Sequence, residues 1–436
     1  MIPTLLAAAT AAVLAALAAR RLERWNIGMP FVMVVAGGLV GLTVTSSVGA
    51  ILNTTGAQRA AELILAVLLF VDATEVRGGR LWGSAPGLAA RMLLVAMPLS
   101  IAAALAVGGF LFPALAFPVL LVLACVVMPI DFASSERVVR DRRLPSRMRS
   151  MLNVEGGYND GIVSPLFLFA LALAGGAAAG GHGPTHALST AVPHALIAIA
   201  VGFVLGTLLG AALDRASHLG WTDSRSRRIV VLLAPVATYS AAVALSGNGF
   251  VAAFVCGISF RYVHRALVAR RLRSGVEAEH TAGSASAALS RDFTLLEDMT
   301  SMLTAAMWFV VGIAGVYFLS GVDVPILVFC VLALTVLRVG PVLLALVGTE
   351  LSGRERLLAG LLGPRGTTTI VFGLLAFNGL PDGDPADTII VSTVLCVVGS
   401  VLLHGFGSGP AIDRLCASGS ARRRARARPA AAAPSP

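Results

Sequence analysis

The sequence predicts an all-α membrane protein that crosses the bilayer about thirteen times. Of its 436 residues, 57% are hydrophobic and 13% are charged, whereas a soluble domain carries about a quarter charged residues. The apolar residues recur in runs along nearly the whole chain, and each run approaches the roughly 20 residues that a helix needs to cross a bilayer. Short clusters of arginine separate many of these runs. This pattern excludes a soluble enzyme and a disordered protein.

Seven apolar runs in the first half of the chain predict the first seven spans. The first run ends at Arg20, whereas a signal peptide carries its positive charges before its apolar stretch. We therefore expect the first helix to be retained. The seven runs cover approximately residues 2–19, 27–45, 59–75, 89–111, 114–133, 151–175 and 187–213.

Six further runs predict the remaining spans. The first two are separated only by the turn-forming pair Gly247–Asn248, and a polar loop over 268–291 follows the second. The six runs cover approximately residues 229–246, 248–264, 296–319, 324–346, 357–378 and 388–406.

The arginine distribution predicts how the chain is oriented in the membrane. All 33 basic residues are arginine, and basic residues favour cytoplasmic loops. With the N-terminus outside and thirteen spans, thirty of them fall in cytoplasmic loops or in the C-terminal tail. Arg59 lies outside, and Arg338 and Arg365 lie within spans. We therefore expect a multi-pass protein of the cell membrane with its N-terminus outside and its C-terminus in the cytoplasm.

The composition also limits which kinds of molecule the protein is expected to bind. Aromatic residues make up only 6% of the chain, too few for a surface that stacks nucleic-acid bases. No soluble segment is large enough to bind a nucleotide, and no motif indicates enzymatic chemistry. The basic segment 411–436 is expected to be a disordered cytoplasmic tail that contacts anionic lipid headgroups. Nucleic acid, nucleotides and enzyme activity are therefore not expected.

Several ionisable side chains fall within or beside the apolar runs, where a charge is costly and marks a functional site by default. Three acids cluster in two neighbouring segments of the first half, and two bases lie in two neighbouring segments near the end. The six residues are Asp72, Asp131, Glu155, Asp160, Arg338 and Arg365.

The fifth run contains a proline beside a carboxylate. In VVMPIDFASS, Pro129 removes a backbone donor and breaks the helix at membrane depth. The carbonyl oxygens freed there, together with Asp131, suit a small hard cation, which prefers oxygen ligands. The alternative is that Asp131 merely begins the following loop.

The sixth run opens on NVEGGYNDGIVSP. Glu155 and Asn159 are four residues apart and share a helical face, whereas Asp160 points about 100° away from Asn159. One carboxylate can therefore be held in a structural pair while the other faces a crevice; alternatively, these residues only cap the helix. Arg338 needs a partner in its apolar run, and Glu155 is the candidate, because an arginine–carboxylate pair relieves two buried charges at once.

A second interrupted helix lies in the twelfth run. GLLGPRGTTTIVFG contains Gly363, Pro364 and Gly366 within an otherwise apolar stretch. Arg365 lies inside this break, and the hydroxyl groups of a threonine run follow it. Glycine and proline interrupt helices, so this segment is expected to support a crossing of two broken helices.

The positions of the two breaks predict an internal repeat. They lie seven spans apart, and an odd offset inverts the second copy in the membrane. Paired breaks in two inverted halves point to the binding site of a transporter. This geometry predicts a transmembrane domain over residues 1–410, with inverted repeats at about 2–175 and 229–406 and a connecting helix at 187–213.

These motifs resemble those of the monovalent cation:proton antiporter-1 family, the NhaP-type sodium/proton exchangers. EGGYNDG, from Glu155 to Gly161, is similar to the family's ESLLNDG, and GPRG, from Gly363 to Gly366, is similar to its GPRG or GWRG. Asp131 precedes Asp160 by 29 residues, the separation between the aspartates of the family's TDP and ND motifs. Arg338 stands where the family keeps an arginine that pairs with the motif glutamate. The four motifs occur in the family's order along the chain.

The resemblance implies an NhaA/NhaP-like antiporter fold, with thirteen helices divided into a dimerisation bundle and a mobile transport bundle. It implies that Asp160 binds cation and proton alternately, that Asp131 completes the site, and that Asn159 supports the crossing region. Glu155 and Arg338 are implied as the structural ion pair. A homodimer is also implied, with Na⁺ or K⁺ and H⁺ as the transported ions and no cofactor. A single aspartate preceded by asparagine implies electroneutral exchange.

The chain departs from the family's pattern at four positions. The TDP threonine is Ile130 here, which leaves only the Ile130 backbone carbonyl as a ligand, and the TDP proline is Phe132. The motif serine is Gly156, and Tyr158 adds a phenol beside the site. Fewer hydroxyl ligands make K⁺ a candidate beside Na⁺. They also leave open an alternative function, that of a transporter-like membrane sensor or regulator that binds an ion without turnover.

Overall fold

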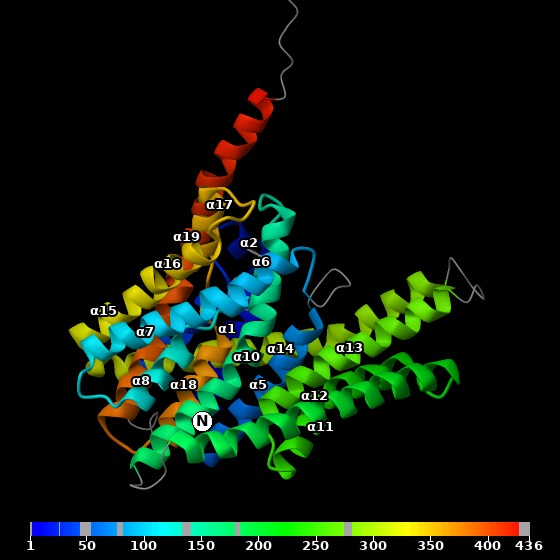
Figure 1. The fold of residues 1–436 in the computed structure, drawn as a ribbon, viewed down its shortest axis with the longest axis horizontal. Coiled ribbons are helices and arrows are strands. Elements are labelled where there is room, and N and C mark those ends of the chain that lie inside the picture. The colour runs from blue at the N-terminus through cyan, green and yellow to red at the C-terminus, as the bar shows by residue number, and fades with distance from the viewer. Residues whose placement is uncertain are drawn as a thin grey trace, which may run out of the picture.

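Helices make up nearly all of the computed structural model (Figure 1). The structure describes residues 2–25, 27–43, 54–75, 82–132, 141–178, 184–273 and 281–426. No strand occurs among these residues, so the predicted all-α class is confirmed. Part of the predicted loop over 268–291 and the last ten residues of the predicted tail lie outside the described residues.

The first half of the chain forms helices that follow the predicted runs. Their bounds are α1 Ile2–Leu17, α2 Ala19–Arg24, α3 Met29–Gly41, α5 Thr55–Glu75, α6 Pro86–Arg91, the π-helix η1 Met92–Ala96, α7 Met97–Leu111, α8 Phe117–Val127, α10 Ser146–Ala178 and α11 Pro184–His218. The π-turn η1 directly precedes α7, where Pro98 clashes with the carbonyl group four residues earlier and so widens the helix.

The second half is likewise helical. Its elements are α12 Ser224–Ala244, α13 Gly249–Arg273, α14 Thr281–Tyr317, the 3₁₀ turn η3 Phe318–Gly321, α15 Val324–Leu334, α16 Val336–Ala345, α17 Gly353–Leu361, α18 Thr367–Gly379 and α19 Asp384–Arg426. Residues 411–426 therefore continue the last helix, whereas the sequence predicts a disordered tail from 411. Alanine and arginine are strong helix formers, and an existing helix extends more easily than a new one begins.

Eight helical stretches among the described residues are long and apolar enough to cross a membrane. Four shorter apolar helices of 10–17 residues accompany them, in α1, α3, α8 and α18. Helix α5 belongs to neither group, since Arg59, Glu62 and Asp72 lie within it. The multi-pass character is thus supported, while the count of thirteen spans and the inverted repeat stay predictions.

Two groups of closely packed helices both contact α10 (Figure 1). Helices α11, α12 and α13 pack against one another, and α13 also packs against α5. On the other side, α7 and α8 pack together with α15, α16, α17, α18 and α19, a group we call the crossing bundle. Helix α10 contacts α8 and α18 of the crossing bundle and also α5, α11 and α13. The charged motif of α10 therefore lies where the two groups meet.

Both predicted breaks are present, and they cross each other. Helix α8 ends at Val127, and residues 129–131 have no regular secondary structure. Helix α17 ends at Leu361, and α18 begins at Thr367. The backbone N–H of Asp131 donates a 2.9 Å hydrogen bond to the carbonyl oxygen of Pro364, which joins the two unwound segments.

A third interruption separates α15 from α16 at Thr335. The sequence predicts one continuous span over 324–346, because no proline or glycine lies between Pro325, in the first turn, and Arg338. In the structure, the carbonyl oxygen of Ala333 accepts a hydrogen bond from Arg365 of the crossing. The interruption therefore coincides with a hydrogen bond from a distant segment, and no proline or glycine lies directly beside it.

Candidate functional site

The first turn of α18 holds the carboxylate of Asp131. The backbone N–H of Thr367 and its hydroxyl group both donate to Asp131 Oδ2, at 2.6 and 2.5 Å. The N-terminus of a helix carries unpaired N–H groups and a partial positive charge, so it stabilises a carboxylate placed there. A Cβ at Gly366 would overlap the Asp131 side chain, so only glycine leaves room for this contact. Asp131 is thus part of the crossing and does not merely begin a loop.

Asp160 is held by the next threonine of α18. The hydroxyl group of Thr368 donates a 2.5 Å hydrogen bond to Asp160 Oδ2. Asp160 is only 1% exposed, and its other oxygen, Oδ1, has no hydrogen-bond partner among the described residues. A buried carboxylate oxygen without a donor is unfavourable unless a proton or a cation neutralises it. The two acids are therefore bound in different ways.

Asn159 joins α10 to the first break. Its side-chain amide donates a 2.6 Å hydrogen bond to the carbonyl oxygen of Ile130. The sequence analysis names this Ile130 carbonyl group as a possible cation ligand. Its bond to Asn159 uses one of its two lone pairs. The amide oxygen of Asn159 is buried and lacks a partner within the described chain. Asn159 therefore contacts the crossing through its nitrogen, while its oxygen remains unpaired.

Glu155 and Arg338, the predicted ion pair, are brought together. Arg338 Nη1 and Nη2 donate to Glu155 Oε1 and Oε2 at 2.9 and 3.2 Å. The two side chains are 3% and 5% exposed, and a two-point contact of this kind fixes both position and orientation. A Cβ at Gly363 would overlap the Arg338 guanidinium group. The first glycine of GPRG therefore makes room for the ion pair.

Arg365 fills the centre of the crossing. Its guanidinium group donates to the carbonyl oxygens of Met128 and Pro129 at 2.7 and 3.1 Å, and to that of Ala333 at 3.0 Å. These carbonyl groups lie at the ends of α8 and α15, where helices carry partial negative charge. The side chain is fully buried. Arg365 thus satisfies backbone groups that the helix breaks expose.

A serine and a histidine of α19 complete the second break. The hydroxyl oxygen of Ser400 accepts the backbone N–H of Arg365 at 2.6 Å. His404 Nδ1 lies 3.2 Å from that hydroxyl, and His404 Nε2 lies 3.1 Å from the carbonyl oxygen of Leu361. Both unwound ends of the second crossing helix therefore have partners on α19.

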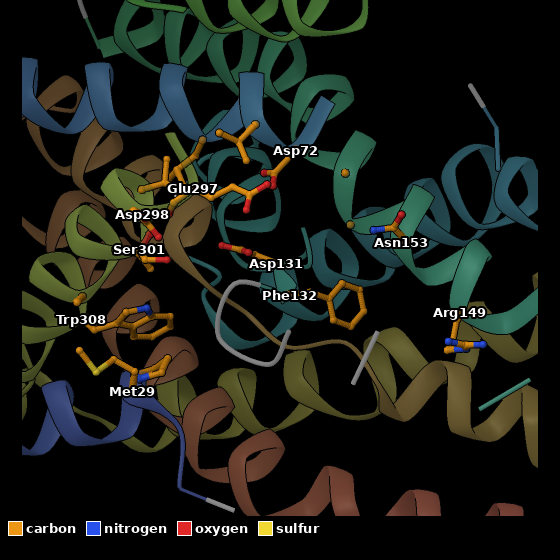
Figure 2. Close-up of a pocket in the computed structure, with 18 of the residues that line it drawn as sticks. Met29, Asp72, Asp131, Phe132, Arg149, Asn153, Glu297, Asp298, Ser301 and Trp308 are labelled. Atoms are coloured by element: carbon orange, nitrogen blue, oxygen red, sulfur yellow. Dashed lines mark hydrogen bonds between the residues drawn. The ribbon is translucent and has the colours of Figure 1, made fainter. Parts of the chain in front are cut away.

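A cavity of about 890 Å³ borders the site (Figure 2). It lies between α5 and α14 on one side and α10 with the first break on the other. Asp131 lines it, as do Gly156 and Gly157 of α10. Four acids and two arginines give it charge: Asp72, Asp131, Glu297, Asp298, Arg142 and Arg149. Asp160 is not among the lining residues, so the cavity stops short of it.

Phe132 and Gly156, two of the departures from the family's pattern, are in steric contact with each other. A Cβ at Gly156 would lie 2.6 Å from the aromatic ring of Phe132. The phenylalanine that replaces proline thus occupies the space that a serine at position 156 would need. Tyr158 packs edge-on against Phe254 of α13, with 5.5 Å between ring centroids, and against Trp82 at 6.3 Å. Tyr158 therefore joins α10 to α13 through its ring.

The structure gathers the predicted residues around the crossing, with some additions. Asp131, Ile130, Asn159, Asp160 and Arg365 meet there, and the Glu155–Arg338 pair lies beside them. Asp72 lines the cavity instead. The sequence analysis predicts no individual role for Thr367, Thr368 or Ser400. For the two threonines, the sequence offers one indication: three consecutive hydroxyl side chains follow directly after the GPRG break.

Comparisons with known proteins agree with this geometry. The profile of the family described as "Sodium/hydrogen exchanger, transmembrane" matches residues 8–413. The chain is 28% identical over 157 residues to the Escherichia coli (strain K12) protein named "Uncharacterized Na(+)/H(+) exchanger YjcE". That aligned stretch covers 35% of this chain and 28% of the length of YjcE.

Solved structures show the same fold. The sodium proton antiporter MjNhaP1 from Methanocaldococcus jannaschii matches with a TM-score of 0.72 and 18% identity, over 95% of this chain and 99% of that one. A second structure of MjNhaP1, from an electron-microscopy map, matches with a TM-score of 0.64 over 95% and 98% of the two chains. The predicted NhaP-like fold is therefore confirmed. The family match spans almost the whole chain, and the chain belongs to the transmembrane sodium/hydrogen exchanger family.

Proposed function

We propose that this protein is a secondary active antiporter that exchanges a monovalent cation, Na⁺ or K⁺, for H⁺. The observation that carries the proposal is Asp160, which is 1% exposed and has one oxygen without a hydrogen-bond donor in the described chain. Desolvation makes such a carboxylate unfavourable as a bare anion. A proton or a cation relieves the charge equally well, but the two cannot occupy the same oxygen together.

Exchange follows from this competition. When a cation reaches deprotonated Asp160, it neutralises the carboxylate, and no proton is then needed. When a proton arrives, it removes the charge that held the cation. One carboxylate therefore trades one cation for one proton, which makes the proposed exchange electroneutral. Alternation between the two membrane faces converts this local competition into transport.

The surrounding residues have separate tasks in the proposal. Asp131 is held by two donors of Thr367, so it stays available as a fixed negative charge near the ion. Asn159 and Arg365 both bind backbone carbonyl groups of the first unwound segment. The Glu155–Arg338 pair anchors α10 to α16. These fixed contacts suit a site that moves as one unit with the crossing bundle.

The acidic cavity provides the entry route in this proposal. Its four carboxylates outnumber its two arginines, and a cleft with an excess of negative charge raises the local concentration of cations. Arg142 and Arg149 line it and fall in the segment 137–149, which the arginine distribution predicts to be cytoplasmic. The cavity would then open to the cytoplasm. We further propose a homodimer in the cell membrane with the C-terminus in the cytoplasm and the basic tail against anionic lipid headgroups, as the sequence implies.

Proton flux into proteoliposomes tests the function. Purified protein is reconstituted with a pH gradient reported by a fluorescent amine, and Na⁺, K⁺, Li⁺ or choline is added separately. Wild type should dissipate the gradient on addition of at least one alkali cation but not choline. Asp160→Asn should abolish the response, while Asp382→Asn, a matched change at an exposed residue, should leave it intact.

The same experiment distinguishes the antiporter from the alternative function, a sensor or regulator that binds an ion without turnover. A folded wild-type protein that binds alkali cations but never moves protons would support the sensor or regulator. An Asp160→Asn variant that still exchanges at a comparable rate would remove Asp160 as the carrier.

A further inference from the structure

The side-chain hydroxyl group beside Asp160 comes from α18, which the sequence analysis does not predict as a source of ligands. Ile130 and Gly156, which flank the crossing, carry no side-chain oxygen. The Thr367 hydroxyl group is used by Asp131. The only side-chain hydroxyl that the structure joins to Asp160, among the residues it describes, is that of Thr368. The site therefore draws its hydroxyl from α18, on the far side of the crossing.

We propose that Thr368 is a ligand of the transported cation, with its hydroxyl oxygen and the Asp160 carboxylate sharing one ion. This inference rests on the proposed antiport function and deepens it. A hydroxyl group has one donor hydrogen and two acceptor lone pairs. Donating to Asp160 Oδ2 uses the hydrogen only, so both lone pairs of Thr368 Oγ1 remain for a cation.

The distance between the two oxygens is compatible with a shared ion. Thr368 Oγ1 and Asp160 Oδ2 lie 2.5 Å apart. Hard cations such as Ca²⁺ bind oxygen ligands at about 2.3–2.6 Å. Two oxygens this close can both lie within bonding distance of an ion of that size. A hydroxyl and a carboxylate are also the oxygen types that hard cations prefer.

The same hydroxyl serves the protonated state. When Asp160 carries a proton, its O–H can donate to Thr368 Oγ1, and the direction of the hydrogen bond reverses. That bond uses a lone pair that the cation would otherwise take. Proton and cation therefore compete for Thr368 as well as for Asp160, which strengthens the exclusion of one by the other.

The position of Thr368 is set by rigid neighbours. It is 2% exposed and lies in the first turn of α18. The backbone before it is held by the Arg365 N–H bond to Ser400 and by the Thr367 N–H bond to Asp131. The positive end of α18 would disfavour a cation, but Asp131 is bound to that end and offsets its charge. A preorganised ligand of this kind binds without a large ordering penalty.

A rival role for Thr368 is to orient Asp160 without touching the ion. The two roles differ in what removal of the hydroxyl does to cation binding itself. Loss of a ligand weakens the equilibrium affinity for the cation in proportion to the lost contact. Loss of an orienting bond alone lowers the turnover rate and leaves the affinity near its wild-type value.

The test compares Thr368→Val, which keeps the shape and removes the hydroxyl, with Thr368→Ser, which keeps the hydroxyl. Thr393→Val is the matched control, since Thr393 is equally buried in the crossing bundle and its hydroxyl bonds only within α19. Binding of NaCl and KCl to the purified full-length protein is measured by calorimetry, and the KM for each cation is measured in proteoliposomes. Folding is checked by thermal unfolding in detergent.

Thr368→Val should weaken cation affinity about tenfold, the size expected for one lost contact to a charged group. Thr368→Ser and Thr393→Val should stay within about twofold of wild type. If Thr368→Val does not fold, Thr368→Ala removes the same hydroxyl and is measured in its place. Folded Thr368→Val with wild-type affinity and only a lower turnover rate overturns the proposal. A wild type that binds cations without exchanging them would sink the antiport function alone, because the affinity comparison still decides the role of Thr368.

Discussion

The side-chain amide of Asn159 donates a 2.6 Å hydrogen bond to the carbonyl oxygen of Ile130. This bond ties α10, which carries the charged motif, to the unwound segment after α8. The Ile130 carbonyl lies outside any helix, so Asn159 supplies the partner that a continuous helix would have provided. The bond thus links the element that carries Asp160 to the element that carries Asp131.

Removing this amide should loosen the crossing. Asn159→Ala leaves the buried Ile130 carbonyl without its donor, which costs about 1–3 kcal/mol. Thermal unfolding in detergent should show a lower Tm, and antiport should fall with it. Asn378→Ala, whose side chain bonds to Leu374 of its own helix, serves as the control and should change the Tm less. An unchanged Tm for Asn159→Ala would mean that the crossing holds together without this bond.

The Glu155–Arg338 pair should behave as one unit. Removing either residue strands an opposite charge among buried groups and costs about 3–5 kcal/mol. Glu155→Ala and Arg338→Ala should each lower the Tm and the yield of folded protein. The double variant Glu155→Gln with Arg338→Met removes both charges and should recover part of the loss. Strictly additive effects of the two single changes would contradict the pairing.

The Phe132–Gly156 contact predicts a sterically coupled pair. Gly156→Ser places a Cβ against the Phe132 ring, and overpacking of this kind costs about 1–3 kcal/mol. Adding Phe132→Ala should restore part of the Tm, because it removes the ring. Gly340→Ser is the matched control, since a Cβ at Gly340 meets nothing within 4 Å. Equal losses with and without the phenylalanine would show that the two departures are independent.

Competition at Asp160 predicts a pH dependence with a definite sign. Protons occupy the carboxylate more often as the pH falls, so the apparent cation affinity should weaken toward acid pH. For a single exchangeable proton, the apparent KM should rise about tenfold per pH unit once protons dominate. Initial exchange rates at several cation concentrations and pH values measure this relation. A KM that stays constant over two acid pH units would exclude direct competition.

Much of the fold follows from local properties of the chain. Apolar runs of span length predict where helices lie, because an unpaired backbone group cannot face lipid and a helix pairs its own. Pro129 and the glycines around Arg365 predict the two breaks, since these residues interrupt a helix wherever it is placed. The cost of an unpaired buried charge makes Glu155 the candidate partner of Arg338, and the family resemblance implies the same pair. The spans and the breaks depend on residue type and short spacing, whereas the ion pair depends on charge.

The tertiary structure decides which buried groups actually satisfy one another. Thr367 and Thr368 are adjacent and chemically identical, yet one binds Asp131 and the other binds Asp160. Arg365 could have paired with an acid, but it binds backbone carbonyl groups freed at the ends of α8 and α15. The interruption at Thr335 has no local breaker at all. Hydrogen bonds and close packing depend on distances and directions between helices far apart in sequence, and those are set only when the crossing segments are assembled.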